Sequence, residues 1–446
     1  MSVLGRGFKQ LRQHPSALVG VTIIAALVCL SIYAITAVPY SEAIRLWRGG
    51  EGIWDESPRN AVPRWVNLFT GKKLPETIIF DTGSDTSKSV EVVSEDIRMV
   101  KLSMPFDYPY DDFPSELTLF LTASFDQQRP KVTMFWLTPD GRQIPLGERS
   151  ISATERYSIS LDQRLRDKLG GQTPEVGLFT SPAGKKVTVL KGGYELCIEA
   201  LLFEKTSGIH AKLVIYGKAE GLAGTDDRRR DLWIALLWGT PIALAFGLVA
   251  AAGSTVTTLI IAAVGVWYGR WVDAIIQRVT EVNAILPALP ILILVGTFYS
   301  RSIWVMLGVI VLLGIFSLGI KVYRSIFLQV KDSPYIEAAR AYGAGNLRIV
   351  LRYMVPRVIP VLVPQFVLLI PSLVFLEAAL AILGLGDPVL PTWGKVLNDA
   401  FQSGALYKGY YHRVIMPSVF LILTGLGFAM LGYALDRIFN PRLRIE

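Results

Sequence analysis

Few residues of this chain combine the type and the spacing that catalysis or metal binding requires. The three histidines, His14, His210 and His412, lie far apart and show no metal-ligand spacing. The chain has no G-x-S-x-G nucleophile motif, and residues 181–186, SPAGKK, lack the first glycine of a phosphate-binding loop. The sequence therefore predicts no catalytic residue, no metal site and no cofactor in this chain.

Four polar residues stand out because they lie inside otherwise apolar segments: Glu281, Asn283, Gln365 and Glu377. Polar groups are costly inside a bilayer, so each is a functional candidate by default. One interpretation is a hydrogen bond or ion pair that only fixes helix packing, typically worth about 0.6 kcal/mol. The other is that these residues, Glu281 and Glu377 above all, line or gate a translocation path. The residues alone leave both interpretations open.

The elements that must position these residues are apolar helices. Of the 446 residues, 51% are hydrophobic and 18% charged, and the mean hydropathy is +0.41, which excludes an ordinary soluble enzyme. A spanning helix needs about 20 mostly apolar residues. The sequence therefore predicts a mainly α membrane protein with six transmembrane helices, at 17–38, 240–267, 273–298, 303–327, 358–384 and 413–436. Prolines in these segments either act as hinges or shape packing: Pro287, Pro290, Pro364 and Pro371.

Charge indicates which side of the membrane each segment end occupies. The first apolar segment is longer than the ~7–15-residue core of a signal peptide, so we expect a retained helix. Lys and Arg gather at the N-terminus, at Arg270, in 321–357 and in 437–444, which places both termini in the cytoplasm. This topology accounts for the net charge of +8 without nucleic acid as a partner.

Residues 41–224 have a more polar composition and contain no segment apolar and long enough to span a membrane. Polarity alternates in 117–122, LTLFLT, and in 194–200, YELCIEA, and turn residues such as Pro139-Asp140-Gly141 separate the runs. A period of two over short runs predicts antiparallel strands. We expect an extracytoplasmic β-rich domain, sandwich-like, at 41–224, between an N-terminus and first helix at 1–40 and a five-helix core at 225–446.

The longest predicted cytoplasmic loop, at 331–357, has the signals of two short helices. Ser333 is placed to N-cap a helix that starts at Pro334, and Gly343 is suited to end it because glycine adopts positive φ readily. Four residues of this helix can share one face: Tyr335, Ile336, Ala339 and Tyr342. A second helix is expected from residue 346 to 355, ended by Pro356. Two short helices between membrane spans would form a rigid cytoplasmic knob.

This loop resembles the coupling motif of binding-protein-dependent ABC importer permeases. The match consists of Glu337-Ala338-Ala339, Gly343 six residues after the glutamate, and Pro356 thirteen after the glycine. Residues 224–247, 380–397 and 440–443 further resemble the C-type permease of dipeptide, oligopeptide and nickel importers. One departure is Arg229, which stands where that family usually has glycine before Arg230-Asp231.

The resemblance implies a type I importer permease (MetI-like) fold in a prokaryotic plasma membrane, and a coupling role for Glu337, Ala338, Ala339, Gly343 and Pro356. It implies four kinds of partner: a B-type permease that forms a heterodimer with this chain, two ATPase subunits that bind ATP and Mg, an extracytoplasmic binding protein, and lipid. The implied substrates are di- or oligopeptides, with nickel chelates or oligosaccharides as alternatives. A membrane-anchored recognition protein is the remaining alternative, although one or two spans would suffice for an anchor.

The resemblance covers the β-rich domain poorly, with a likeness only at residues 61–75 to members that have longer insertions. The role of the domain stays open between two interpretations. It could be the surface on which the binding protein docks, with Trp47, Trp54 and Trp65 as anchors. It could instead be a cap that packs on the partner permease and stabilises the assembly.

Overall fold

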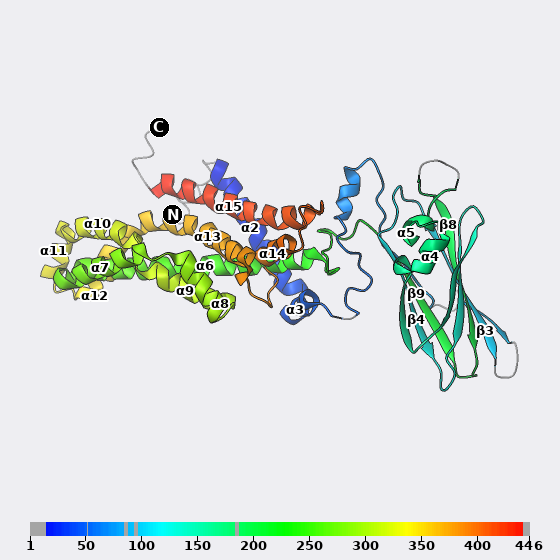
Figure 1. Ribbon diagram of the computed structural model, residues 1–446. Helices are drawn as coiled ribbons and strands as arrows, with labels where there is room; N and C mark the ends of the chain where they lie inside the picture. The colour runs from blue at the N-terminus through cyan, green and yellow to red at the C-terminus, as the bar shows by residue number, and fades with distance from the viewer. Residues whose placement is uncertain (1–14, 51, 84–87, 93–96, 183–186, 440–446) are drawn as a thin grey trace. The chain divides into compact units, whose positions relative to one another are not determined.

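The computed structural model describes residues 15–50, 52–83, 88–92, 97–182 and 187–439 (Figure 1). His14, the tail at 440–443 and the last four residues of the SPAGKK segment lie outside these ranges. The chain forms two compact units, each with its own core: one contains the helices on either side of residues 49–233, and the other is residues 49–233. The boundaries fall slightly further along the chain than the residues 41 and 224 expected from the sequence.

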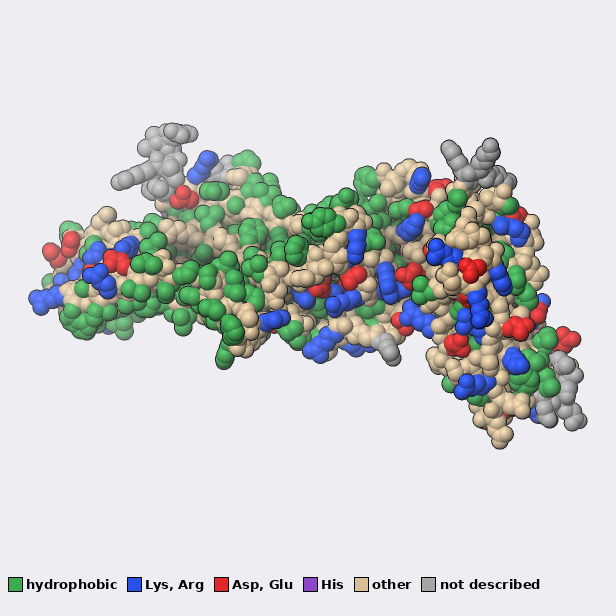
Figure 2. All heavy atoms as spheres, in the orientation of Figure 1, with side chains coloured by type: hydrophobic (Ala, Val, Ile, Leu, Met, Phe, Trp, Pro, Cys, Tyr) green, Lys and Arg blue, Asp and Glu red, His purple; other side chains and the backbone are tan. Residues whose placement is uncertain are grey.

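The first unit is helical and apolar. Among the described residues, four helical stretches are long and apolar enough to cross a membrane: Pro15–Ala37 (α2), Leu232–Tyr268 (α6), Asn346–Leu385 and His412–Phe439 (α15). Two bent helix pairs raise the number to as many as six if each pair is one span. On the visible face of this unit, hydrophobic side chains cover most of the surface (Figure 2). Charged ones gather near the end that holds α10 (Gly319–Lys331) and α11 (Pro334–Ala341), as labelled in Figure 1.

The spans expected at 273–298 and 303–327 are each a bent pair of helices in the structure. Helices α7 (Arg270–Ile285) and α8 (Ala288–Phe298) meet at 73°, and α9 (Ile303–Ile315) and α10 (Gly319–Lys331) meet at 43°. Pro287 explains the first break, because proline disfavours helical geometry in the residue before it. Leu286 is accordingly extended, with φ −67° and ψ 124°.

Pro356 does not end a helix, contrary to the sequence prediction. Helix α12 (Asn346–Ile349) continues through a π turn at Val350–Met354 into α13 (Val355–Leu380). A proline inside an α-helix clashes with the carbonyl four residues earlier and lacks one donor. The wider π turn immediately before Pro356 provides the local adjustment that accommodates the ring. A second π turn, Ala381–Leu385, follows α13 and leads to α14 (Trp393–Gln402).

The first helix packs against the last one of the described chain, so α2 and α15 lie side by side. Their backbones approach closely at Gly20, where an added Cβ would come within 2.7 Å of the Gly427 carbonyl oxygen. A short helix, α3 (Tyr40–Arg48), follows α2 and buries Trp47, which is only 3% exposed. Trp47 is therefore wrong as a docking anchor; Trp54 is half-buried, and Trp65 is 43% exposed.

The second unit is the expected β-rich domain, built as two antiparallel sheets that share one core. The described strands form sheets of order β1-β9-β4-β7 and β2-β3-β8-β5-β6. Two 3₁₀ helices and two short α-helices accompany the described strands: Arg64–Leu68, Ile159–Leu161, α4 (Gln163–Lys168) and α5 (Pro174–Gly177). The strands are β1 (Ile78–Asp81), β2 (Lys88–Val92), β3 (Arg98–Tyr108), β4 (Glu116–Ser124), β5 (Lys131–Leu137), β6 (Gln143–Ser150), β7 (Thr154–Ser158), β8 (Gly192–Leu202) and β9 (Gly208–Tyr216).

The alternation of apolar and polar residues along the sequence corresponds to the buried and outward-facing positions of the strands. Leu117, Leu119 and Leu121 of β4 are fully buried and face residues of β8 and β3 across the core. Along β8, every second residue from Tyr194 to Ala200 is buried. The turn at residues 138–142 joins β5 to β6, and Gly141 supplies its positive φ of 84°. The strand prediction is confirmed at each of these places.

The segment 224–231 is tied to the start of the same unit. The Thr225 hydroxyl donates to the Pro58 carbonyl (2.7 Å) and accepts from the Ala61 amide (2.9 Å). Arg230 and Asp226 form a buried ion pair at 2.6 Å. Asp231 accepts from the Trp233 amide at the start of α6, and burial raises the pKa of this carboxyl. The motif that resembles the importer family is thus closed by residues from the start of the same unit.

Arg229 has a special place in this segment. Its φ is +68°, the left-handed region that favours glycine. Its guanidinium is buried, donates to Glu116 of β4 and to the Ser57 carbonyl (2.7 Å), and lies 4.2 Å from the Tyr216 ring centroid. Arg229, which departs from the pattern of the family that the chain resembles, therefore has a strained backbone conformation, and its side chain forms hydrogen bonds and a ring contact with the sandwich.

We predict that Arg229→Ala lowers the opening free energy of β4 and β9 by about 2 kcal/mol, because it removes charge-assisted hydrogen bonds. Arg229→Gly should cost about 1 kcal/mol less than Arg229→Ala, since glycine relieves the left-handed strain. Hydrogen exchange of the strand amides in the full chain measures both values. Arg228→Ala, at an exposed neighbouring position, is the matched control. Equal losses for the alanine and glycine variants would contradict the strain argument.

Candidate functional site

The loop at 331–357 forms a compact helical turn between α10 and α13. Helix α11 runs from Pro334 to Ala341, with Ser333 in the extended conformation of an N-cap residue (φ −77°, ψ 142°). The Ser333 hydroxyl does not cap the helix; it donates instead to the Gln329 carbonyl at 3.2 Å. Proline at the first helical position fits because its missing N–H would have no intrahelical partner there.

Gly343 ends α11 as predicted. Its φ is +77°, and its amide donates to the Arg340 carbonyl at 2.9 Å, while the Ala344 amide reaches back to the Ala339 carbonyl at 3.0 Å. Helix ends of this kind favour glycine because other residues are strained in the left-handed region. Gly345, two residues later, has an ordinary φ of −68° and precedes α12.

One face of the loop is buried in the helical unit. Ile336 is fully buried and Ala339 is 8% exposed, and both belong to a cluster with residues of α6, α10 and α13. Tyr335 is partly buried beside them, but Tyr342 is 93% exposed, so the expected four-residue face holds for three. The buried members from the other elements include Val266, Phe327, Ile349, Met354 and Val358.

Three cationic side chains fasten the loop to its neighbours. The Lys331 ammonium donates to the Val266 carbonyl (2.5 Å) and the Trp267 carbonyl (3.2 Å), which caps the C-terminal end of α6. The Arg340 guanidinium lies 4.5 Å from the Trp267 ring centroid. Arg357 of α13 lies 5.2 Å from the Tyr335 ring centroid. These contacts link the loop to both α6 and α13.

The opposite face of the loop is exposed. Glu337, Ala338 and Gly343 are exposed, as is Pro356, and Leu347 is 72% exposed. Of the five residues assigned to the coupling motif, only Ala339 points into the core. The loop thus presents a polar carboxylate and apolar side chains on a fixed backbone, an arrangement that suits contact with another protein. In the described parts of the chain, no group of three or more His, Cys, Asp or Glu gathers to hold a metal ion.

Comparison with known proteins identifies the family. Residues 254–445 match the family model described as "Binding-protein-dependent transport system inner membrane component". A glutathione transport system permease protein from Pectobacterium atrosepticum is 31% identical over 224 residues, which are 50% of this chain and 72% of that protein. The chain belongs to this family of inner membrane transport components.

Other relatives of the permease are similar over a comparable length. A dipeptide transport system permease protein from Alkalihalophilus pseudofirmus is 28% identical over 227 residues, covering 51% of this chain and 73% of that protein. An oligopeptide transport system permease protein from Bacillus subtilis is 27% identical over 222 residues, covering 50% and 72%. The predicted resemblance to peptide importer permeases is confirmed.

Asn283 of the permease has a packing role in the structure. Its side-chain amide donates to the Leu313 carbonyl (3.0 Å) and the Phe316 carbonyl (3.1 Å), at the broken end of α9. Thr258 of α6 donates to the Gly314 carbonyl at the same break (3.0 Å). Because both carbonyls would otherwise lack helical partners, Asn283 stabilises the junction between α9 and α10.

The other three polar residues lie in different surroundings. Glu281, on the exposed side of α7, accepts from Arg278 (3.2 Å) and Lys321 (3.3 Å). Gln365 is exposed on α13, and Glu377 is only 7% exposed near the end of the same helix. Twelve residues of helix separate Gln365 from Glu377, about 18 Å along the axis. Within this chain, the four residues do not form one cluster.

Glu377 adjoins a segment that the sequence analysis did not single out for function. Thr392 and Asp387 lie beside it. Asp387 accepts from the Ile303 amide at the start of α9 (3.1 Å) and from the Val389 amide (2.9 Å). Trp393 is fully buried and donates to the Leu236 carbonyl of α6 at 3.0 Å. An aspartate followed by proline is a common turn signal, so Asp387 could have been found from sequence.

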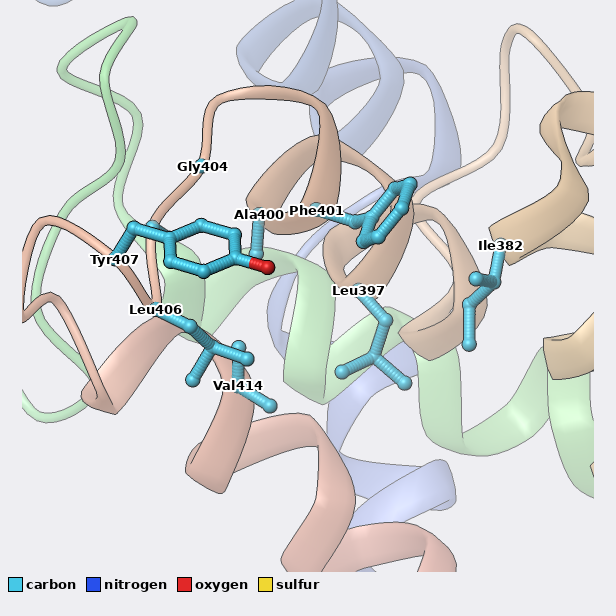
Figure 3. Close-up of a pocket in the computed structure, with 9 residues that line it drawn as sticks. Ile382, Leu397, Ala400, Phe401, Gly404, Leu406, Tyr407 and Val414 are labelled. Atoms are coloured by element: carbon cyan, nitrogen blue, oxygen red, sulfur yellow. The ribbon is translucent and has the colours of Figure 1, made fainter.

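An apolar cavity of about 310 Å³ lies between the end of α14 and the first turn of α15 (Figure 3). Phe401 and Tyr407 enter it from different sides, and Leu397 and Val414 line the space between them. Tyr407 contributes a hydroxyl, but the lining has no charged side chain. The cavity therefore offers nothing that would recognise the charged termini of a peptide.

Lys331 was not a candidate from sequence, because the carbonyls it caps lie 65 and 64 residues away. We predict that Lys331→Met lowers the opening free energy of the loop by about 1.5 kcal/mol, since charged hydrogen bonds are lost. Hydrogen exchange of residues 334–343 should then accelerate by about tenfold. Lys321→Met, on the same helix but in an exposed ion pair, is the control and should change exchange little. Unchanged exchange in Lys331→Met would rule out the capping role.

Proposed function

We propose that this chain is one permease subunit of an ATP-binding-cassette importer, and that the loop at 331–357 receives the movement of ATPase subunits. The single observation that carries the proposal is that α11 has one exposed face while its other face is buried in the helical unit. Contacts of Lys331, Arg340 and Arg357 hold the loop in this position. A surface that transmits force must be both accessible and fixed to the spans, and this loop has both properties. ATP and Mg would be bound by the partner subunits.

The proposed substrates are di- or oligopeptides delivered by an extracytoplasmic binding protein. Support comes from the relatives, whose names describe transport of dipeptides, oligopeptides and glutathione. Nickel chelates and oligosaccharides are the alternatives. In the proposed topology, both termini are cytoplasmic, six spans cross a prokaryotic plasma membrane, and the sandwich is extracytoplasmic.

The proposed path for the substrate lies between this chain and a B-type permease, since one set of spans cannot enclose an alternating-access path. Glu281 is exposed and can face such a partner, whereas Glu377 is enclosed by its own chain and would act by holding the segment around Asp387. Asn283 is occupied by backbone carbonyls. We therefore keep Glu281 as the first candidate for the path and Gln365, also exposed, as the second.

The coupling proposal predicts that Glu337→Lys and Gly343→Val leave membrane insertion and subunit assembly intact but uncouple ATP hydrolysis from uptake. Glu337→Lys reverses a charge on the docking face, and Gly343→Val forces a β-branched residue into the left-handed region. Uptake and ATPase activity in proteoliposomes, with copurification of the ATPase subunits, measure the effect.

Gly345→Val is the matched control for Gly343→Val. Both glycines are exposed and have open space where a Cβ would stand, but only Gly343 requires positive φ. The control should transport normally. Normal uptake by either Glu337→Lys or Gly343→Val would show that the loop is not the coupling element.

For the sandwich we propose docking of the binding protein, with the cap on the partner permease as the alternative. Replacing residues 49–222 by a short flexible linker keeps α3 and the first helix in place. If the sandwich is the dock, binding-protein-stimulated ATPase activity falls while assembly with the second permease survives. If the assembly itself is lost, the sandwich is a cap.

A further inference from the structure

An exposed apolar patch lies on the second unit where the 3₁₀ helix Arg64–Leu68 meets residue 222. Leu68 is 81% exposed, Phe69 80%, Leu222 59% and Trp65 43%. These four residues are called the apolar patch below. Large apolar side chains exposed together usually mark a contact surface. Of the four, only Trp65 has a role above, as a possible docking anchor, and Leu68, Phe69 and Leu222 have none.

The apolar patch is held rigidly by its own fold. The Trp65 indole donates to the Leu222 carbonyl at 3.0 Å, and the Trp65 and Phe69 rings meet edge-on with centroids 6.2 Å apart. Asn67 closes the loop behind them through hydrogen bonds with the Leu74 carbonyl (3.2 Å) and amide (3.0 Å). The exposed side chains therefore project from a fixed base, without the ordering cost of a flexible loop.

Basic residues follow the apolar patch directly. Lys72 and Lys73 are exposed three and four residues after Phe69, on a turn that the Thr70 hydroxyl closes by donating to the Lys72 carbonyl (2.9 Å). Exposed Trp, Phe and Leu beside lysines are the composition of segments that lie in the membrane interface. There the rings enter the headgroup region and the ammonium groups meet anionic phosphates.

The apolar patch is also next to the point where the chain becomes a spanning helix. Leu222 is two residues from Gly224, whose carbonyl accepts from the amide of Leu232, the first residue of α6 (3.0 Å). Two residues cover at most about 7 Å. The seven residues 232–238 are all apolar, so the hydrophobic helix starts at this place.

We propose that the apolar patch contacts the bilayer surface, with Leu68 and Phe69 in the headgroup region and Lys72 at the lipid phosphates. A lipid surface fits better than a second protein because the patch is small. Even an aromatic side chain buries only about 150–250 Å², so four partly buried side chains fall short of the ~800 Å² per partner of a stable protein interface. The proposal requires only that the chain spans a membrane, and it is independent of the substrate and of the coupling role.

Spin labels at single cysteines test this proposal in the full chain, reconstituted with its copurifying subunits in phosphatidylethanolamine–phosphatidylglycerol vesicles. The label replaces Phe69 in a background with Cys29→Ser and Cys197→Ser. A second label at Leu161 is the control, since this residue is 82% exposed and belongs to the same sandwich. Collisions with oxygen, which concentrates in lipid, and with a water-soluble nickel complex report where each label lies.

The expected result is a Phe69→Cys label about 5–10 Å inside the headgroup boundary, accessible to oxygen and shielded from nickel, and a Leu161→Cys label in water. Lys72→Glu should move the first label toward water. A label at 69 that is open to nickel overturns the proposal, because the patch would then be solvated. A label shielded from both reagents also overturns it, because a protein would cover the patch. No shift with Lys72→Glu would overturn the contact between Lys72 and the phosphates.

Discussion

Every backbone polar group inside a bilayer needs a partner within the protein, and the membrane unit depends on how its broken helices meet this requirement. At the end of α9, Asn283 binds the Leu313 and Phe316 carbonyls, and Thr258 adds a second hydrogen bond to the Gly314 carbonyl. At its start, Asp387 accepts the Ile303 amide. Each partner belongs to a different element, so the two ends of α9 are joints that hold several helices together.

The same requirement explains which parts of the structure could be predicted from sequence. The strands of the sandwich follow from the local alternation of apolar and polar residues, and the turn at Gly343 follows from the preference of glycine for left-handed geometry. Both predictions are correct. The role of Asn283 depends on carbonyls 30 and 33 residues away, which no local pattern reveals. A proline usually ends a helix, but the π turn before Pro356 keeps the helix continuous, with Val350 and Met354 buried in the cluster beneath the loop.

The conformation of the segment that precedes α6 depends on contacts with the β-rich domain. The segment at 224–231, which resembles a motif of the importer family, is closed in this chain by residues 57–61 and by β4. Arg229 links this segment to the sandwich, because it occupies a backbone conformation suited to glycine and uses its side chain to bind Glu116 and Tyr216. A sequence departure from the family pattern thus marks the residue that contacts the added domain.

The packing of α2 on α15 has a consequence for biosynthesis. The residues from Ala37 to His412 separate the two helices, a stretch that a ribosome completes in roughly 20–75 s. During that time the first helix has to reside in the membrane without the glycine-rich surface of α15 that later receives Gly20. Its uniformly apolar sequence allows this wait, because lipid can solvate it on all sides until the final helix arrives. The order of insertion, and not only the final contacts, therefore constrains the composition of α2.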